Sequence, residues 1–110
     1  MPNTFKNQTL KAAGTTAQNA YAAGAGVQAT VIGMTIANIT ASPISANVIL
    51  SGGTITNNVY LVKDATIAPG GALVPVGGDQ KLVLEAGDYL QVNTSIASAA
   101  DVIVSVLEVT

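Results

Sequence analysis

The sequence predicts an all-β protein, a single-domain antiparallel β-sandwich of jelly-roll type with eight to nine strands. Three observations lead to this prediction. The 110 residues include 13 Val, 9 Ile and 12 Thr, and β-branched side chains fit a pleated strand better than a helix. The 11 Gly, 4 Pro and 8 Asn place turn signals roughly every 8–12 residues, which is typical of sandwiches and jelly rolls. No repeat of fixed period and no internal domain boundary interrupts the pattern.

The N-terminal segment, residues 1–13, is expected to be either the first strand or an arm that reaches a neighbouring molecule. Its large hydrophobic residues are Met1, Phe5 and Leu10, so it gains little by packing onto its own domain. The sandwich domain then spans residues 14–110. It begins with a region of small residues that predicts one short strand at Gln18–Ala22.

Two long strands are expected next, at residues 28–40 and 44–51, with a turn at Pro43 between them. A period of two places Ile32 and Ile36 of the first strand on one face. Gly33 follows Ile32 directly, and a glycine inside a strand indicates a β-bulge or a close backbone contact.

The second half of the chain predicts shorter strands at residues 57–63, 66–69, 72–76, 80–85 and 88–94. A turn at Asp64-Ala65 is expected to separate the first two, and glycine pairs and Asp79 mark later turns. The strand that contains Pro75 is expected at a sheet edge, because proline cannot donate to a neighbouring strand. The predicted core consists of Ile32, Ile36, Leu50, Leu61, Leu82, Leu84, Leu90, Val104 and Val106.

The last strand, residues 101–109, is apolar on both faces. Val102, Val104 and Val106 share one face, and Ile103, Leu107 and Val109 share the other. A strand with one solvated face alternates apolar and polar residues, so we expect something to cover the second face. The cover is either a loop or the N-terminal segment of the same chain, or a neighbouring subunit. The low charge favours association, and we expect a homo-oligomer, a dimer or trimer.

The composition excludes several kinds of site. The chain has no Cys and no His, so it lacks disulfides, Cys/His metal sites and Ser-His or Cys-His nucleophiles. Four Lys face six acidic residues in a chain of net charge −2, which leaves no basic patch for nucleic acid. No apolar run reaches the roughly 18–20 residues of a spanning helix. We therefore expect no enzymatic activity, cofactor, metal, nucleic acid or membrane partner.

Two further groups of residues have a structural and a functional interpretation. Asp79, Glu85 and Asp88 lie around one predicted hairpin, where carboxylates can act as acid and base or bind a hard cation. Capping of backbone N–H groups is the interpretation that we favour.

The aromatic residues are Phe5, Tyr21, Tyr60 and Tyr89. We favour packing in the core or at an interface over a platform for stacking sugars.

Residues 82–92 form the pattern Leu-x-Leu-x-Ala-Gly-Asp-x-Leu-x-Val. With residues 59–81, the opening residues 1–6 and the closing residues 101–108, they resemble small β-sandwich virion proteins that are encoded among the structural genes of tailed bacteriophages, including phages of cyanobacteria. The resemblance implies a non-enzymatic component of the virion, made in the host cytoplasm. It favours a capsid decoration (cement) protein that stabilises the shell and binds the major capsid protein or other virion subunits. A small neck or tail subunit, or a receptor- or carbohydrate-binding module, is the alternative.

The candidate interface combines the N-terminal segment with the second face of the last strand. Its residues are Phe5, Lys6, Lys11, Ile103, Leu107 and Val109. Phe5 is expected to be the apolar anchor of the N-terminal segment. The two lysines are expected to add salt-sensitive contacts to acidic groups of the shell.

Overall fold

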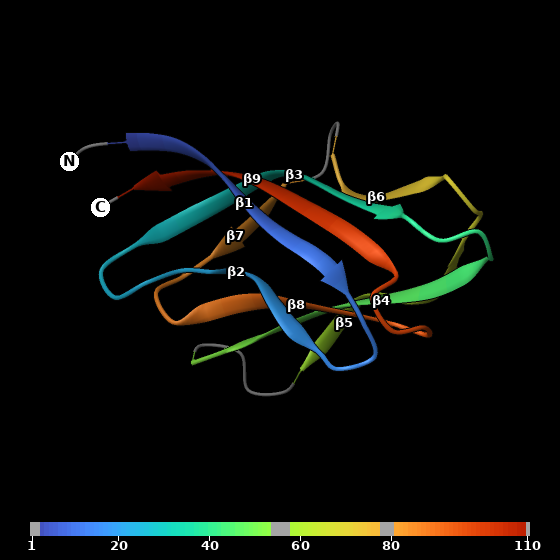
Figure 1. Ribbon diagram of the computed structural model, residues 1–110. Coiled ribbons are helices and arrows are strands. Elements are labelled where there is room, and N and C mark those ends of the chain that lie inside the picture. Colours follow the sequence, from blue (N-terminus) through green and yellow to red (C-terminus); the bar gives the residue numbers. More distant parts are fainter. Residues whose placement is uncertain (1–2, 54–57, 78–80, 110) are drawn as a thin grey trace.

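Two antiparallel β-sheets pack face to face in the computed structural model, which describes residues 3–53, 58–77 and 81–109 (Figure 1). The described residues form strands and no helix. The strands are β1 (Asn3–Ala13), β2 (Gln18–Ala22), β3 (Gln28–Asn38), β4 (Ile44–Gly52), β5 (Val59–Ile67), β6 (Ala72–Val76), β7 (Leu82–Leu84), β8 (Asp88–Thr94) and β9 (Ala100–Val109).

The strand order is that of a jelly roll. One sheet has the order β1-β9-β3-β6, with β7 also paired to β3, and the other has the order β2-β8-β4-β5. The first strand therefore pairs with the last, β2 pairs with β8, β3 with β6, and β4 with β5. This pairing of strands from the two ends of the chain inward is the double Greek key of the jelly roll. The predicted all-β sandwich is confirmed.

The hydrophobic core fills the space between the two sheets. Five of the residues predicted for it are fully buried, namely Ile36, Leu84, Leu90, Val104 and Val106. Leu50, Leu61 and Leu82 are partly buried and pack against the edge of the core cluster. The core is completed by further buried side chains, among them Val31, Met34, Val48, Val76 and Val92.

The prediction that Ile32 belongs to the core is wrong. The register between β3 and β9 shifts between Val31 and Gly33, which is the bulge that the glycine indicated. The bulge inserts one residue, so Val31 and Met34 are buried while Ile32 lies on the outer side of the sheet. The prediction from a strict period of two fails here because the inserted residue shifts the alternation of inward and outward side chains by one position.

The predicted turn at Asp64-Ala65 is also wrong, because β5 continues as one strand to Ile67. The chain absorbs the irregularity as a bulge opposite Asn47, where Asp64 has a φ of 53°. The Asn47 side chain accepts a hydrogen bond of 2.7 Å from the Asp64 backbone N–H. A side chain from the neighbouring strand thus replaces the backbone partner that the bulge removes.

The predicted edge position of Pro75 agrees with the structure, and a few predictions fall on residues that the structure does not describe. Pro75 lies in β6, which pairs with β3 on one side only, so its predicted edge position is confirmed. The predicted turn at Gly78 and Asp79, together with Met1 and the first residue of the predicted strand 57–63, lies outside the described residues.

Candidate interaction surface

The five-stranded sheet has one face on the core and one face open to solvent. In β9, Val102, Val104 and Val106 are buried beneath the second sheet, whereas Ile103 between them is 41% exposed. Leu107 and Val109 share the side of Ile103. We call this open side, contributed by β1, β9, β3, β6 and β7, the outer face.

The strand register aligns apolar and threonine side chains in rows across the outer face. Phe5 lies opposite Leu107, which lies opposite Thr30 and then Val83. Phe5 is 75% exposed and Val83 is 63% exposed. Apolar side chains this exposed along one row of a sheet face are typical of an interaction surface.

A second row follows nearer the other end of the outer face. Thr9 lies opposite Ile103, which lies opposite Thr35, and Val74 of β6 is 59% exposed on the same side. The outward positions of the described strands between these two rows carry Asn7, Ser105, Ile32 and Gly33 and no charged side chain.

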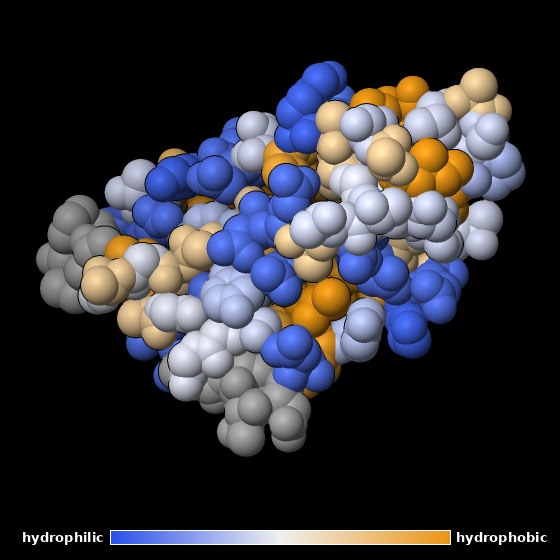
Figure 2. Space-filling view, turned by 60° about the horizontal axis from the view of Figure 1, so that its bottom comes forward, coloured by the Kyte–Doolittle hydropathy of each residue, from blue (hydrophilic) through white to orange (hydrophobic). Residues whose placement is uncertain are grey.

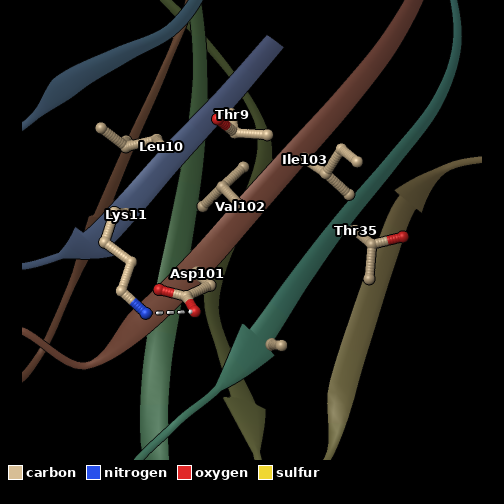
Figure 3. Close-up of a pocket in the computed structure, with 8 residues that line it drawn as sticks. Thr9, Leu10, Lys11, Thr35, Asp101, Val102 and Ile103 are labelled. Carbon is tan, nitrogen blue, oxygen red and sulfur yellow. Dashed lines mark hydrogen bonds and ion pairs between the residues drawn. The ribbon is translucent and has the colours of Figure 1, made fainter. Parts of the chain in front are cut away.

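A groove of about 300 Å³ runs along the second row (Figure 3). Its walls come from β1, β9 and β3, with Thr9 on one side and Thr35 and Ala37 on the other. Ile103 stands between them, and the Lys11–Asp101 ion pair lies at one end (Figure 3). Because Ala37 is small, the groove has room for an apolar group from another molecule.

The Asp101 carboxylate fixes the end of the groove. One of its oxygens accepts a hydrogen bond of 2.9 Å from the Ala12 backbone N–H, and the other lies 3.1 Å from the Lys11 ammonium. The hydrogen bond from Ala12, and then the contact with Lys11, lower the pKa of Asp101 below its ordinary value. Ala12 has a φ of 55° at the point where the β1–β9 register shifts, so this carboxylate holds an irregular turn of β1 in place.

No segment of the described chain covers the outer face. The N-terminal segment pairs with β9 edge to edge as β1, from Asn3 opposite Val109 to Ala13 opposite Ala100. It therefore extends the sheet rather than lying over the apolar side of β9 (Figure 1). The sequence left two possible covers open for this face. In the described residues, neither a loop nor the N-terminal segment of the same chain lies over it. A neighbouring molecule as the cover stays a prediction.

The structure separates the candidate interface residues into two groups. Phe5, Ile103, Leu107 and Val109 lie on the outer face, and Lys11 stands at the end of the groove. Lys6 lies opposite Val106, on the other side of β1 from Phe5, with its ammonium 3.8 Å from Glu108. Thr9, Thr35 and Ala37 were not anticipated, because the groove joins strands that are distant in the sequence.

The β1 strand also exposes a free edge that differs from the other sheet edges. β2 has five residues and a register shift, β5 contains two bulges, and the far edge of the larger sheet is divided between the short β6 and β7. β1 keeps a continuous register from Asn3 to Leu10, with Lys6 as its one charge in that stretch. Proteins commonly protect edges by shortening, bulging, proline or charge, and this stretch of β1 has little such protection.

An inter-sheet contact lies at the core-facing side of the free stretch of β1. The buried Tyr21 of β2 donates a hydrogen bond of 2.5 Å to the carboxylate of Glu108 in β9. The same carboxylate oxygen lies near the Lys6 ammonium. Burial raises the pKa of Tyr21 well above its ordinary value, and the hydrogen bond and charge of Glu108 act in the same direction.

This contact predicts that the stability of the fold decreases at alkaline pH because of Tyr21. Because its pKa is higher in the folded chain, Tyr21 stabilises the fold below its unfolded pKa near 10, and this stabilisation is lost as the pH rises further. Y21F is expected to cost about 1–3 kcal/mol at neutral pH through the lost hydrogen bond. In urea unfolding, the gap between wild type and Y21F should narrow from about pH 9 to about pH 11.

The exposed Tyr60 supplies the control for this prediction, since Y60F removes a hydroxyl from the surface of β5. Y60F should leave the unfolding free energy nearly unchanged over the same pH range. A gap between wild type and Y21F that stays constant or widens above pH 10 would contradict the assigned hydrogen bond.

The acidic residues of the β7–β8 turn have a structural role where the structure describes them. The buried Asp88 accepts a hydrogen bond of 3.1 Å from the Glu85 backbone N–H, and its own N–H donates to the Glu85 carbonyl. This agrees with the capping interpretation, while Asp79 lies outside the described residues. Within residues 3–53, 58–77 and 81–109, no three acidic side chains gather as a metal-binding group. That part of the chain also has no helix long and apolar enough to cross a membrane.

The aromatic side chains are divided between the core and the two sheets. Tyr21 is buried, Phe5 stands on the outer face, and Tyr60 and the half-buried Tyr89 lie in β5 and β8 of the other sheet. The Lys63 ammonium lies 4.9 Å from the centre of the Tyr60 ring. Phe5 and Tyr60 therefore do not form a shared stacking platform.

The outward side of the smaller sheet is more polar than the outer face. Asn47 donates a hydrogen bond to Asn93, and Gln91 donates one to Asn19. Figure 2, which brings the bottom of Figure 1 forward, shows hydrophilic residues spread over this side between smaller hydrophobic patches. These amides bond to one another across the strands, so the two sides of the sandwich present different chemistry.

The sequence matches no protein-family model and no curated protein.

Proposed function

We propose that the protein is a non-enzymatic structural component of a phage particle, a capsid decoration protein that stabilises the shell. The proposal builds on the resemblance of residues 59–92 and of both chain ends to small virion proteins. What supports it in the fold is the free edge of β1. A jelly roll with an open strand edge and an outer face of few charges is suited to binding other proteins.

The contact with the shell is proposed to form by strand addition. An extended segment of the major capsid protein would pair with β1 along residues 3–10, where the register is continuous. Main-chain hydrogen bonds supply affinity in this mode, and alternate side chains supply specificity. Many such contacts over a shell can hold its subunits together without a pocket or a reactive group.

The edge contact predicts that charge added along β1 blocks binding to the shell. Thr4 and Gln8 are exposed and lie on the side of β1 that faces away from the outer face. The double variant T4K/Q8K places lysines along the free edge, a device that natural edges use against strand addition. We expect wild type to co-sediment with particles assembled without it, and T4K/Q8K to lose most of this binding.

The matched control is Q18K/A22K, which adds the same charge at exposed positions of the shorter β2 edge. It should bind particles as wild type does. Failure of the wild-type chain to bind such particles would contradict the decoration role. Equal loss of binding in both double variants would mean that added positive charge weakens binding wherever it is placed. That result would contradict strand addition at β1.

A further inference from the structure

We infer that two copies of the chain pack their outer faces together around a two-fold axis, with Phe5 of each copy inserted into the groove of the other. This inference does not depend on the proposed role in a phage particle. It rests on a projecting ring and a matching groove that lie on the same face of the sheet. A surface that carries both is complementary to a second copy of itself, as a two-fold interface requires.

Phe5 is the projecting group. Its side chain is 75% exposed and stands beside Leu107 on the outer face. An aromatic side chain loses much apolar area when it is buried and is a common anchor at interfaces. Within its own chain Phe5 has no burial that would explain a phenyl ring at this position.

The groove between Thr9 and Ala37 is the matching site. Its volume of about 300 Å³ exceeds that of an engineered cavity of about 150 Å³ that holds benzene. Apart from the Lys11–Asp101 pair at one end, the outward side chains that line it are those of Thr9, Thr35, Ala37 and Ile103. A phenyl ring from outside fits both its size and its polarity.

The positions of the ring and the groove on β1 are consistent with a two-fold arrangement. Phe5 and Thr9 point to the same side and are four residues apart, which is about 14 Å along a strand. A two-fold axis in the interface plane, midway between them, exchanges the two sites. The row of Phe5 and Leu107 in one copy then lies over the row of Ile103 and Thr35 in the other, as in aligned packing of two sheets.

The size and charge of the outer face agree with a dimer. Four strands side by side are about 19 Å wide, and the length of β9 adds about 34 Å. The resulting area of roughly 650 Å² is close to the roughly 800 Å² that each partner buries in a standard interface. The outward positions described for β1, β9 and β3 beyond the Lys11–Asp101 pair are uncharged, so bringing these three strands of two copies together desolvates no charged side chain of theirs outside that ion pair.

The dimer leaves the edge of β1 accessible. Face-to-face packing covers the outer face, whereas strand addition occurs in the plane of the sheet. The two contacts therefore involve different surfaces, and T4K/Q8K should leave the dimer intact.

Sedimentation equilibrium of the full chain tests the dimer. Wild type is expected to show a monomer–dimer equilibrium. F5A should raise the dimer dissociation constant by about 30-fold or more, the effect of truncating a hot-spot side chain. A37F should do the same by filling the groove, and the effects of F5A and A37F should not add in the double variant. V59A, which trims a half-exposed valine of β5, should leave the constant unchanged.

Disulfide cross-linking tests the arrangement directly, because the natural chain contains no cysteine. Under oxidising conditions, F5C mixed with T9C should form a covalent dimer faster than either variant alone, because the two-fold arrangement places residue 5 of one copy over residue 9 of the other. Near-UV and far-UV circular dichroism would verify that each variant is folded. A wild-type chain that remains monomeric at all concentrations overturns the inference, as does F5C alone cross-linking as fast as the mixture.

Discussion

Replacing Leu90 with alanine is expected to lower the free energy of unfolding by about 2–5 kcal/mol, the range for large-to-small changes at fully buried sites. Leu90 is fully buried in β8. It lies between Tyr21 of β2 and Leu50 of β4. Strands on both sides restrict how far the cavity can collapse, and the cost increases with the cavity that remains.

The matched control is I39A, which removes the same number of carbon atoms from a half-exposed side chain outside the strands. It should cost less than about 0.5 kcal/mol, as surface substitutions usually do. Urea unfolding followed by circular dichroism measures both. A loss below about 1 kcal/mol for L90A would mean that Leu90 does not face a close-packed core.

The second large effect is expected at Gly52, where β4 ends beside β8. Gly52 has a φ of 140°, a conformation that side chains with a Cβ rarely adopt. A Cβ on Gly52 would come within 2.4 Å of the Asp88 Cα and 2.6 Å of the Gly87 carbonyl oxygen. Both are backbone atoms, of the first residue of β8 and of the turn that precedes it. The clash and the backbone strain together should make G52A cost about 3 kcal/mol or more.

Gly33 provides the control, because it also lies in a strand but a Cβ there meets no atom within 4 Å. G33A should change the unfolding free energy by less than about 0.5 kcal/mol, the usual range for an open site. Thermal unfolding of both variants at one pH is sufficient. If G52A and G33A prove equally mild, the close approach of β4 to Asp88 is contradicted.

In strands without a β-bulge, the regular alternation of the sequence predicted correctly which side chains face the core. In β8 and β9 the side chains alternate without interruption, so Leu90 and Val104 were placed correctly. The same reasoning failed at Ile32, because the extra residue of the bulge reverses the faces of the strand. It failed again at Asp64, where the partner that stabilises the irregular backbone is the distant side chain of Asn47.

The interaction surface could be predicted only in part, for a related reason. The apolar second side of β9 and the exposed Phe5 follow from the sequence pattern. The groove does not, because Thr9, Thr35 and Ile103 meet only through pairing of the first, third and last strands. The hydrogen bond from Tyr21 to Glu108 likewise joins residues 87 positions apart, and no local pattern indicates it.

The proposed role in a phage particle is tested most directly by the copy number of the chain in purified particles. Quantitative mass spectrometry against the major capsid protein gives this number. A decoration protein of the shell predicts on the order of hundreds of copies, whereas a closed ring at the neck or tail would hold about a dozen. Hundreds of copies, with the shell less stable when the chain is omitted, are the result that we expect. Absence from the particles, or a copy number of ring size, would contradict the decoration role.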